Sequence, residues 1–221
     1  MRCFGAIAVL VLALGACAQT RYVEMPTDPG NEQPAHAISR TVQYRQDDLL
    51  LTQPPACLLV IGDAGGNVAP ELVIIIEQAL TRHLLQRARR VVVGEMRDRE
   101  ARRLGIAPLE TVNARQLASR IGCEGIVEYK VTDAEARYLL FYTRLAMTLD
   151  VRTVRSSDGN ELWRARHATA KSSGGPPTSL AAVFSAWSAT ELAGDGEAVE
   201  GLVEEIVRRL MATWPVARRP A

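Results

Sequence analysis

Apolar residues fall into short runs and helical stripes along the chain, and these predict alternating strands and helices. Residues 57–61 form an apolar run between two prolines and a glycine-rich stretch, which is typical of a strand buried on both faces. From 70 to about 88, apolar residues recur at helical spacing behind a proline and predict a helix. The apolar run at 90–93 predicts a second strand.

The pattern changes to strand alternation further along the chain. Two helices are expected first, over 96–104 and 113–121. Apolar and polar residues then alternate in three segments, which predict strands over 125–131, 138–154 and 161–170. We interpret these strands as an antiparallel meander with one face toward water.

Turn residues and later helical stripes complete the predicted fold. Residues 133–136 are expected to separate the first two meander strands, and Asp158 and Gly159 suit a tight hairpin. Helices are expected over 179–192 and 197–214. The order predicts an α/β fold with a mixed sheet of about five strands (β-α-β-α-α-β-β-β) and carboxy-terminal helices from about residue 178.

The amino terminus has the pattern of a bacterial export signal. Residues 1–16 place one arginine before an apolar run that is too short to be a stable membrane anchor. The run ends in the letters LGAC, which resemble the lipobox of bacterial lipoproteins, where the cysteine is lipidated and the peptide is cut before it. We therefore expect a lipid on Cys17, the alternative being an ordinary secretory cut beside a chance cysteine. Because no aspartate follows Cys17, the resemblance implies the outer membrane, on its periplasmic face.

Residues 17–55 are expected to be the lipidated cysteine and a flexible tether, ahead of a single α/β domain over 56–221. The segment contains five prolines and little apolar periodicity. About 35 flexible residues span roughly 30–35 Å. Tyr22, Val23, Tyr44 and residues 49–51 are exceptions. They could form a strand that docks on the body or part of a partner-binding stretch, and we favour docking.

Composition and charge exclude some partners. The chain of 221 residues has 26 Lys and Arg against 25 Asp and Glu, a formal net charge of +1. Such a balance does not suit binding to nucleic-acid phosphates, and an aromatic content of 5% offers few platforms for base stacking. We therefore expect no nucleic acid as a partner.

Glycines and histidines, which often form phosphate-binding or metal sites, are present, but not at the spacing that such sites need. The glycine-rich stretch 62–66 lies between a strand and a helix, but it lacks the pattern of a phosphate-binding loop. His36, His83 and His167 are scattered along the chain, without the spacing of zinc ligands. We assign no catalytic residue, no metal site and no cofactor.

Two surfaces are candidates for binding. Arginines outnumber acidic residues between 82 and 103, which could form a patch for an acidic partner, anionic lipid or peptidoglycan, although we favour a solvated helical surface. Phe184 and Trp187 lie on an apolar helical stripe that could contact a partner, although we favour packing on the sheet. The arginines are Arg82, Arg87, Arg89, Arg90, Arg97, Arg99, Arg102 and Arg103.

Two motifs carry a resemblance to a known group of proteins. One is the step from a helix into an apolar strand at 121–127, with the letters IGCEGIV, and the other is the hairpin SDGNELW at 157–163. With these motifs the chain resembles, from about 57 to 170, the bacterial lipoproteins whose body looks like the amino-terminal domain of TolB. This group includes LpoB, an activator of a penicillin-binding protein, and the non-pore part of CsgG. Cys123 and Glu124 depart from the usual Ala-Asp, which favours the lipoproteins of unknown function within this group.

The resemblance also bears on two cysteines. In the fold that it implies, the strands that begin near Cys57 and follow Cys123 are parallel neighbours, with both cysteines at the entering end. Neighbouring strands lie close enough for a disulfide, and the periplasm is oxidising. A disulfide and two buried free thiols are both compatible with the sequence.

These features together predict a lipid-anchored protein that works by binding. The leading hypothesis is a non-catalytic accessory or assembly subunit of a cell-envelope complex, with an envelope protein as its partner and oligomers possible. One alternative is an LpoB-like activator of a penicillin-binding protein in peptidoglycan synthesis, and a lesser one is an envelope hydrolase.

Overall fold

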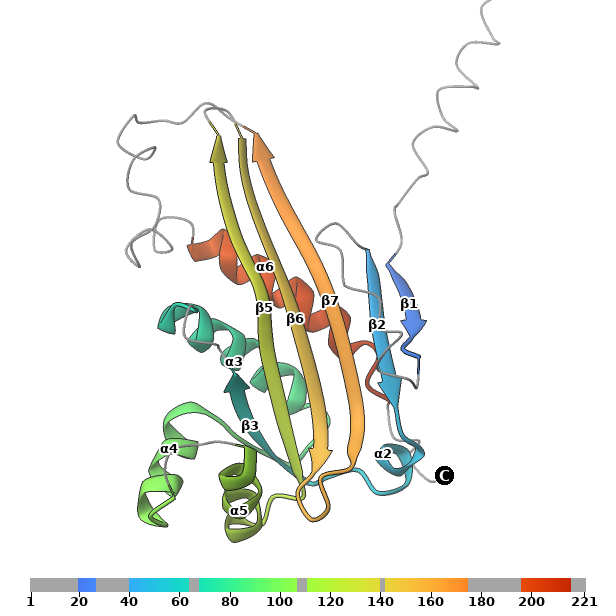
Figure 1. The fold of residues 1–221 in the computed structure, drawn as a ribbon, viewed down its shortest axis with the longest axis vertical. Coiled ribbons are helices and arrows are strands. Elements are labelled where there is room, and N and C mark those ends of the chain that lie inside the picture. Colours follow the sequence, from blue (N-terminus) through green and yellow to red (C-terminus); the bar gives the residue numbers. More distant parts are fainter. Residues whose placement is uncertain are drawn as a thin grey trace, which may run out of the picture.

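The computed structural model describes residues 20–26, 40–63, 68–106, 111–139, 142–174 and 196–215 (Figure 1). The predicted order of strand, helix, strand, two helices and three strands is present from β3 to β7. In chain order the elements are β1 (Arg21–Glu24), β2 (Thr41–Gln46), α2 (Asp48–Thr52), β3 (Cys57–Asp63), α3 (Pro70–Leu84), β4 (Arg90–Val92), α4 (Gly94–Arg103), α5 (Thr111–Ile121), β5 (Gly125–Leu139), β6 (Tyr142–Arg155), β7 (Glu161–Gly174) and α6 (Gly196–Met211).

The described strands form one mixed sheet of seven strands, in the order β1-β2-β7-β6-β5-β3-β4. Strand β3 is parallel to β4 on one side and to β5 on the other. Strands β5, β6 and β7 form the antiparallel meander that the alternating pattern predicts. The α/β fold class is thereby confirmed.

Helices cover the two faces of the sheet unequally. Helices α3 and α6 pack on one face and build the larger core, while α4 and α5 pack on the opposite face beside β3 (Figure 1). In β3, Leu58 and Val60 belong to the larger core, and Leu59 and Ile61 belong to the smaller one. This strand is buried on both faces, as its unbroken apolar run predicts.

The carboxy-terminal helix α6 packs on the sheet. Its apolar stripe is buried in the larger core, together with Trp214 just beyond the helix. The ring centroids of Trp163 and Trp214 lie 5.0 Å apart, and the indole N–H of Trp163 donates to the Thr213 hydroxyl at 3.1 Å. The other expected helix, over 179–192, lies outside the described residues.

Part of the expected tether belongs to the sheet, which corrects the sequence-based boundary at residue 56. Strand β2 pairs with β7, β1 pairs with β2, and α2 follows β2. Val42 and Leu50 are 0% and 2% exposed. The described sheet therefore has seven strands and not five, because docking on the edge of β7 buries Val42 and Leu50.

A second difference concerns residues 133–136, which were expected to separate two strands. Strand β5 instead continues to Leu139, with an irregularity between Val131 and Asp133. Pairing with β6 goes on residue by residue beyond that point. The ladder of backbone hydrogen bonds therefore extends through a segment whose composition is typical of a turn.

Candidate functional site

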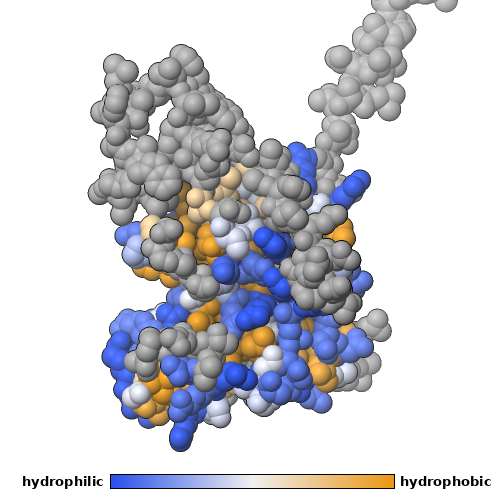
Figure 2. Space-filling model, in the orientation of Figure 1, coloured by the Kyte–Doolittle hydropathy of each residue, from blue (hydrophilic) through white to orange (hydrophobic). Residues whose placement is uncertain are grey.

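One face of the meander carries a set of alternating charges, which we call the charged face. It lies opposite the larger core, and in Figure 2 the middle of this side of the molecule is mostly hydrophilic. Helices α4 and α5 lie on this side of the sheet, but they pack beside β3. None of the described helices therefore covers the charged positions of the meander. The charged face consists of Arg45, Glu128, Lys130, Asp150, Arg152, Glu161, Arg164 and Arg166.

Ion pairs connect neighbouring strands across the charged face. Arg164 donates to both carboxylate oxygens of Asp150, at 3.1 Å from Nε and 2.8 Å from Nη2. Arg152 donates to Glu128 at 2.5 Å, and Arg45 donates to Glu161. Five cationic residues face three acidic ones, so the charged face has an excess of positive charge. The pairs are partly exposed, the Arg164–Asp150 pair by 22% and 13%, and ion pairs near the surface contribute little to stability.

A separate group of polar side chains is buried at the carboxyl end of β3. Glu77 on α3, 8% exposed, accepts a hydrogen bond at 2.7 Å from Arg97 on α4. Arg97 also donates to the Val60 carbonyl at 3.1 Å and to Asp98 at 2.9 Å. The Tyr129 hydroxyl on β5 lies 3.4 Å from the same Glu77 oxygen. The cluster therefore joins two helices to the sheet.

The pKa values in this cluster keep its charges and protons in place. Burial and the nearby Glu77 carboxylate raise the pKa of Tyr129 well above its usual value, so the phenol stays protonated and donates. For Arg97, burial alone would lower the pKa, but hydrogen bonds and attraction to Asp98 and Glu77 outweigh it and raise the pKa. The raised pKa values keep Tyr129 and Arg97 protonated near neutral pH, so both side chains act as hydrogen-bond donors that connect elements of the fold.

Gly62 makes the position of Tyr129 possible. A Cβ atom at residue 62 would stand 2.3 Å from the Tyr129 ring and hydroxyl. The first glycine of the glycine-rich stretch is therefore needed for close packing inside the sheet. Residues 64–67 lie outside the described residues.

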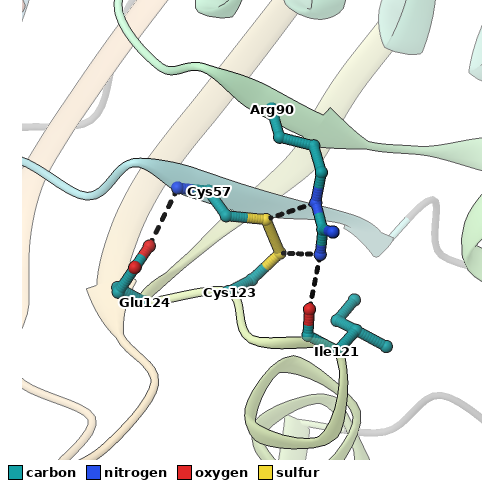
Figure 3. Close-up of a disulfide and its surroundings, with 5 residues drawn as sticks. All are labelled: Cys57, Arg90, Ile121, Cys123 and Glu124. Carbon is teal, nitrogen blue, oxygen red and sulfur yellow. Dashed lines mark hydrogen bonds between the residues drawn. A yellow bond between two sulfur atoms is a disulfide. The ribbon is translucent and has the colours of Figure 1, made fainter.

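Cys57 and Cys123 form a disulfide between the starts of two parallel strands, with Cα atoms 4.5 Å apart (Figure 3). The guanidinium of Arg90 on β4 lies against both sulfurs, at 3.2 Å from Cys57 and 3.6 Å from Cys123. Glu124 accepts a hydrogen bond from the Cys57 backbone N–H at 2.8 Å. Cys123 and Glu124, together with Arg90, thus connect β3, β4 and the start of β5.

The histidines of the described part pair with other groups and not with one another. His83 lies 2.8 Å from Glu204, between α3 and α6. His167 is fully buried, with Nδ1 at 3.0 Å from the Thr41 carbonyl and Nε2 at 3.2 Å from Arg209. Burial lowers the pKa of His167, and the charge of Arg209 lowers it further. These effects outweigh the hydrogen bond to the Thr41 carbonyl and the charge of Glu205, which raise it. In this part of the chain no group of three potential metal ligands comes together.

The arginine-rich segment does not form one patch. Arg87 and Arg97 are partly buried and donate to carbonyls and to Glu77, and the exposed Arg90 donates to the disulfide. Arg99 and Arg103 are exposed and pair with acids on their own helix. The solvated helical surface that we favour from the sequence describes the exposed arginines. The sequence did not reveal the partly buried arginines, because Glu77, the acid that pairs with Arg97, lies on another helix.

Three predicted site residues cannot be placed. Cys17, Phe184 and Trp187 lie outside the described residues, so their expected roles stay predictions. Among the helices that the structure describes, none has the length and apolar character needed to cross a membrane.

Comparisons with known proteins found similar solved structures. No protein-family model matches the chain, and no curated protein matches it. Similar solved structures include a PelC dodecamer from Paraburkholderia phytofirmans, with a TM-score of 0.41, 12% identity and coverage of 81% of this chain and 99% of that chain. Lipoprotein GNA1162 from Neisseria meningitidis has a TM-score of 0.42 and 17% identity, over 70% and 99% of the two chains. The LpoB carboxy-terminal domain from Escherichia coli has a TM-score of 0.37 and 17% identity, over 51% and 81%. These are structures to which the chain is similar, at low sequence identity.

Proposed function

We propose that this chain is a lipoprotein on the periplasmic face of the outer membrane, anchored by lipid on Cys17. It acts as a non-catalytic accessory or assembly subunit of a cell-envelope complex, by binding another envelope protein. The export signal and the LGAC letters support the anchor.

The charged face is the observation that carries the binding role. It extends over four neighbouring strands, β2, β7, β6 and β5, and no described helix packs on it. Its excess of cationic residues favours a partner surface with an excess of acidic residues. The ion pairs within it hold the side chains in place before binding, which lowers the entropy cost of association.

The buried polar cluster supports a role without catalysis. A hydrolase needs a base or a nucleophile that reaches a substrate. Glu77 is instead occupied by Arg97 and Tyr129 inside the fold. The most buried acid of the described part therefore serves to join elements.

Site-specific photocrosslinking in intact cells tests the binding role. A photoreactive residue at Arg152, on the charged face, is expected to capture an envelope protein, while the same residue at Arg102, exposed on α4, is not. Arg164→Glu should lower the yield of that adduct several-fold, because it reverses a charge next to Asp150. Absence of an adduct at Arg152, or the same adducts from both positions, would contradict the proposal.

The identity of the captured protein separates the two binding hypotheses. A penicillin-binding protein in the adduct would indicate an LpoB-like activator, and another envelope component would indicate an assembly subunit. A second copy of this chain would indicate an oligomer.

A further inference from the structure

Arg166 differs from the other cations of the charged face, because it has no ion pair of its own. Arg45, Arg152 and Arg164 each donate to an acid of the same face. Lys130 also interacts with another group. Within the part of the chain that the structure describes, no acid and no hydrogen-bond acceptor pairs with the Arg166 guanidinium. Its positive charge is therefore not balanced by an internal partner.

The acid opposite Arg166 in the sheet is already occupied. Arg166 lies on β7, and its register partners are Asp150 on β6 and Gln43 on β2. Both carboxylate oxygens of Asp150 accept hydrogen bonds from Arg164, two positions before Arg166 on the same strand. Such a two-bond pair between a guanidinium and a carboxylate is stronger than a single hydrogen bond. Asp150 is therefore held by Arg164 and leaves Arg166 without an ion pair.

The Arg166 side chain reaches solvent with the outer end of its guanidinium. The residue is partly exposed, and its Nε is buried without a hydrogen-bond partner. The two Nη atoms also lack a partner, but they are not buried. A carboxylate binds this end of a guanidinium through two parallel hydrogen bonds, one from each Nη. The exposed part of Arg166 thus has the geometry to bind one carboxylate from outside the chain.

The surroundings of Arg166 suit a contact that contributes strongly to binding. It lies on β7, between β2 and β6, and not on the outer strands of the charged face. The Arg164–Asp150 and Arg45–Glu161 pairs lie on the same face, and their side chains are partly exposed. Interface residues that dominate affinity are often arginines near the centre, and the contacts around them exclude water. Exclusion of water strengthens a hydrogen bond between charged groups.

We propose that Arg166 is the position on the charged face that binds a carboxylate of the partner protein, from an aspartate or a glutamate side chain. Each Nη atom of Arg166 donates one hydrogen bond to this carboxylate, while the internal ion pairs of the face stay in place. These pairs hold the neighbouring side chains and leave one guanidinium for recognition. The inference rests on the binding role of the proposed function, and it names the chemical group of the partner that the charged face recognises.

Photocrosslinking in intact cells from a photoreactive residue at Arg152 tests this role, with Arg166→Gln as the variant and Arg45→Gln as the matched control. Each substitution removes one positive charge from the charged face, so both weaken the long-range attraction to an acidic partner equally. Arg166→Gln should lower the adduct yield about tenfold, and Arg45→Gln should lower it no more than about twofold. Equal losses would assign the effect to net charge and overturn the proposal, as would an unchanged yield with Arg166→Gln.

Thermal unfolding of the two purified variants controls for their folding. If Arg166→Gln lowers the Tm by more than about 5 °C, Arg166→Lys takes its place in the experiment. Lysine keeps the positive charge but cannot form the two parallel hydrogen bonds, so the adduct yield should still fall several-fold. A yield with Arg166→Lys equal to that of the unaltered chain would overturn the proposal.

Charge exchange tests the carboxylate of the partner directly. Arg166→Glu should abolish the adduct, and replacement of one acidic residue of the captured surface by arginine should restore most of the yield. Failure of every acidic residue of that surface to restore it would overturn the proposal. Absence of any adduct with Arg166 intact would refute the proposed function and this inference with it, whereas an adduct that does not depend on Arg166 refutes the inference alone.

Discussion

Replacement of Leu50 tests whether the segment before β3 is part of the folded body. Leu50 lies in α2 and is 2% exposed within the larger core, whereas its neighbour Leu51 is 41% exposed. Leu50→Ala and Leu51→Ala make the same chemical change at adjacent positions of one helix. The difference between them therefore isolates the burial of the side chain.

The expected magnitude follows from that burial. Truncation of a buried leucine to alanine costs about 2–5 kcal/mol, from lost transfer free energy and the cavity left behind. The exposed Leu51→Ala should change the free energy of unfolding by no more than about 0.5 kcal/mol. For a chain of this size the loss at Leu50 corresponds to a fall in Tm of about 4–20 °C.

Urea unfolding of the mature chain, followed by tryptophan fluorescence, measures both variants. The midpoint for Leu50→Ala should fall while the slope of the transition is unchanged. If the two variants differ by less than about 0.5 kcal/mol, α2 does not contribute to the core.

Three further predictions concern buried groups. Alkylation of the unfolded, unreduced mature protein should add no group at Cys57 and Cys123, and two added groups would disprove the disulfide. Replacing both cysteines by serine should lower the free energy of unfolding by roughly 4 kcal/mol, because the bond closes a loop of about 67 residues in the unfolded chain. Glu77→Gln should lower the free energy of unfolding by about 1–3 kcal/mol, because it leaves the partly buried Arg97 with only the more exposed Asp98 as a charge partner. The exposed Glu95→Gln should change little, and equal effects of the two substitutions would contradict the role of the cluster. Because the pKa of His167 is lowered in the folded chain, the unfolded chain takes up a proton at this residue more readily. The free energy of unfolding, measured from about pH 7 down to pH 5, should therefore fall with the pH. A His167→Gln variant with the same pH dependence would refute this.

The sequence by itself determined the elements that have a strong apolar pattern. The double-sided burial of β3, the helical period of α3 and the alternation in β6 each repeat within a few neighbouring residues. Such periods report which side of an element meets the core, and they need no knowledge of the partner element. The fold class and the parallel arrangement of β3 and β5 followed from these elements together with the family resemblance.

Only the tertiary structure decided the features that join distant segments. Strand β2 has few apolar residues, and its place in the sheet comes from backbone hydrogen bonds to β7, far along the chain. Backbone groups are the same in every residue, so such pairing leaves little trace in the sequence. The same holds for Glu77, Arg97 and Tyr129, whose charges and hydroxyl come from three separate elements. Each looks like a surface or strand residue in its own segment, and only the packing of α3 and α4 on the sheet makes them one buried cluster.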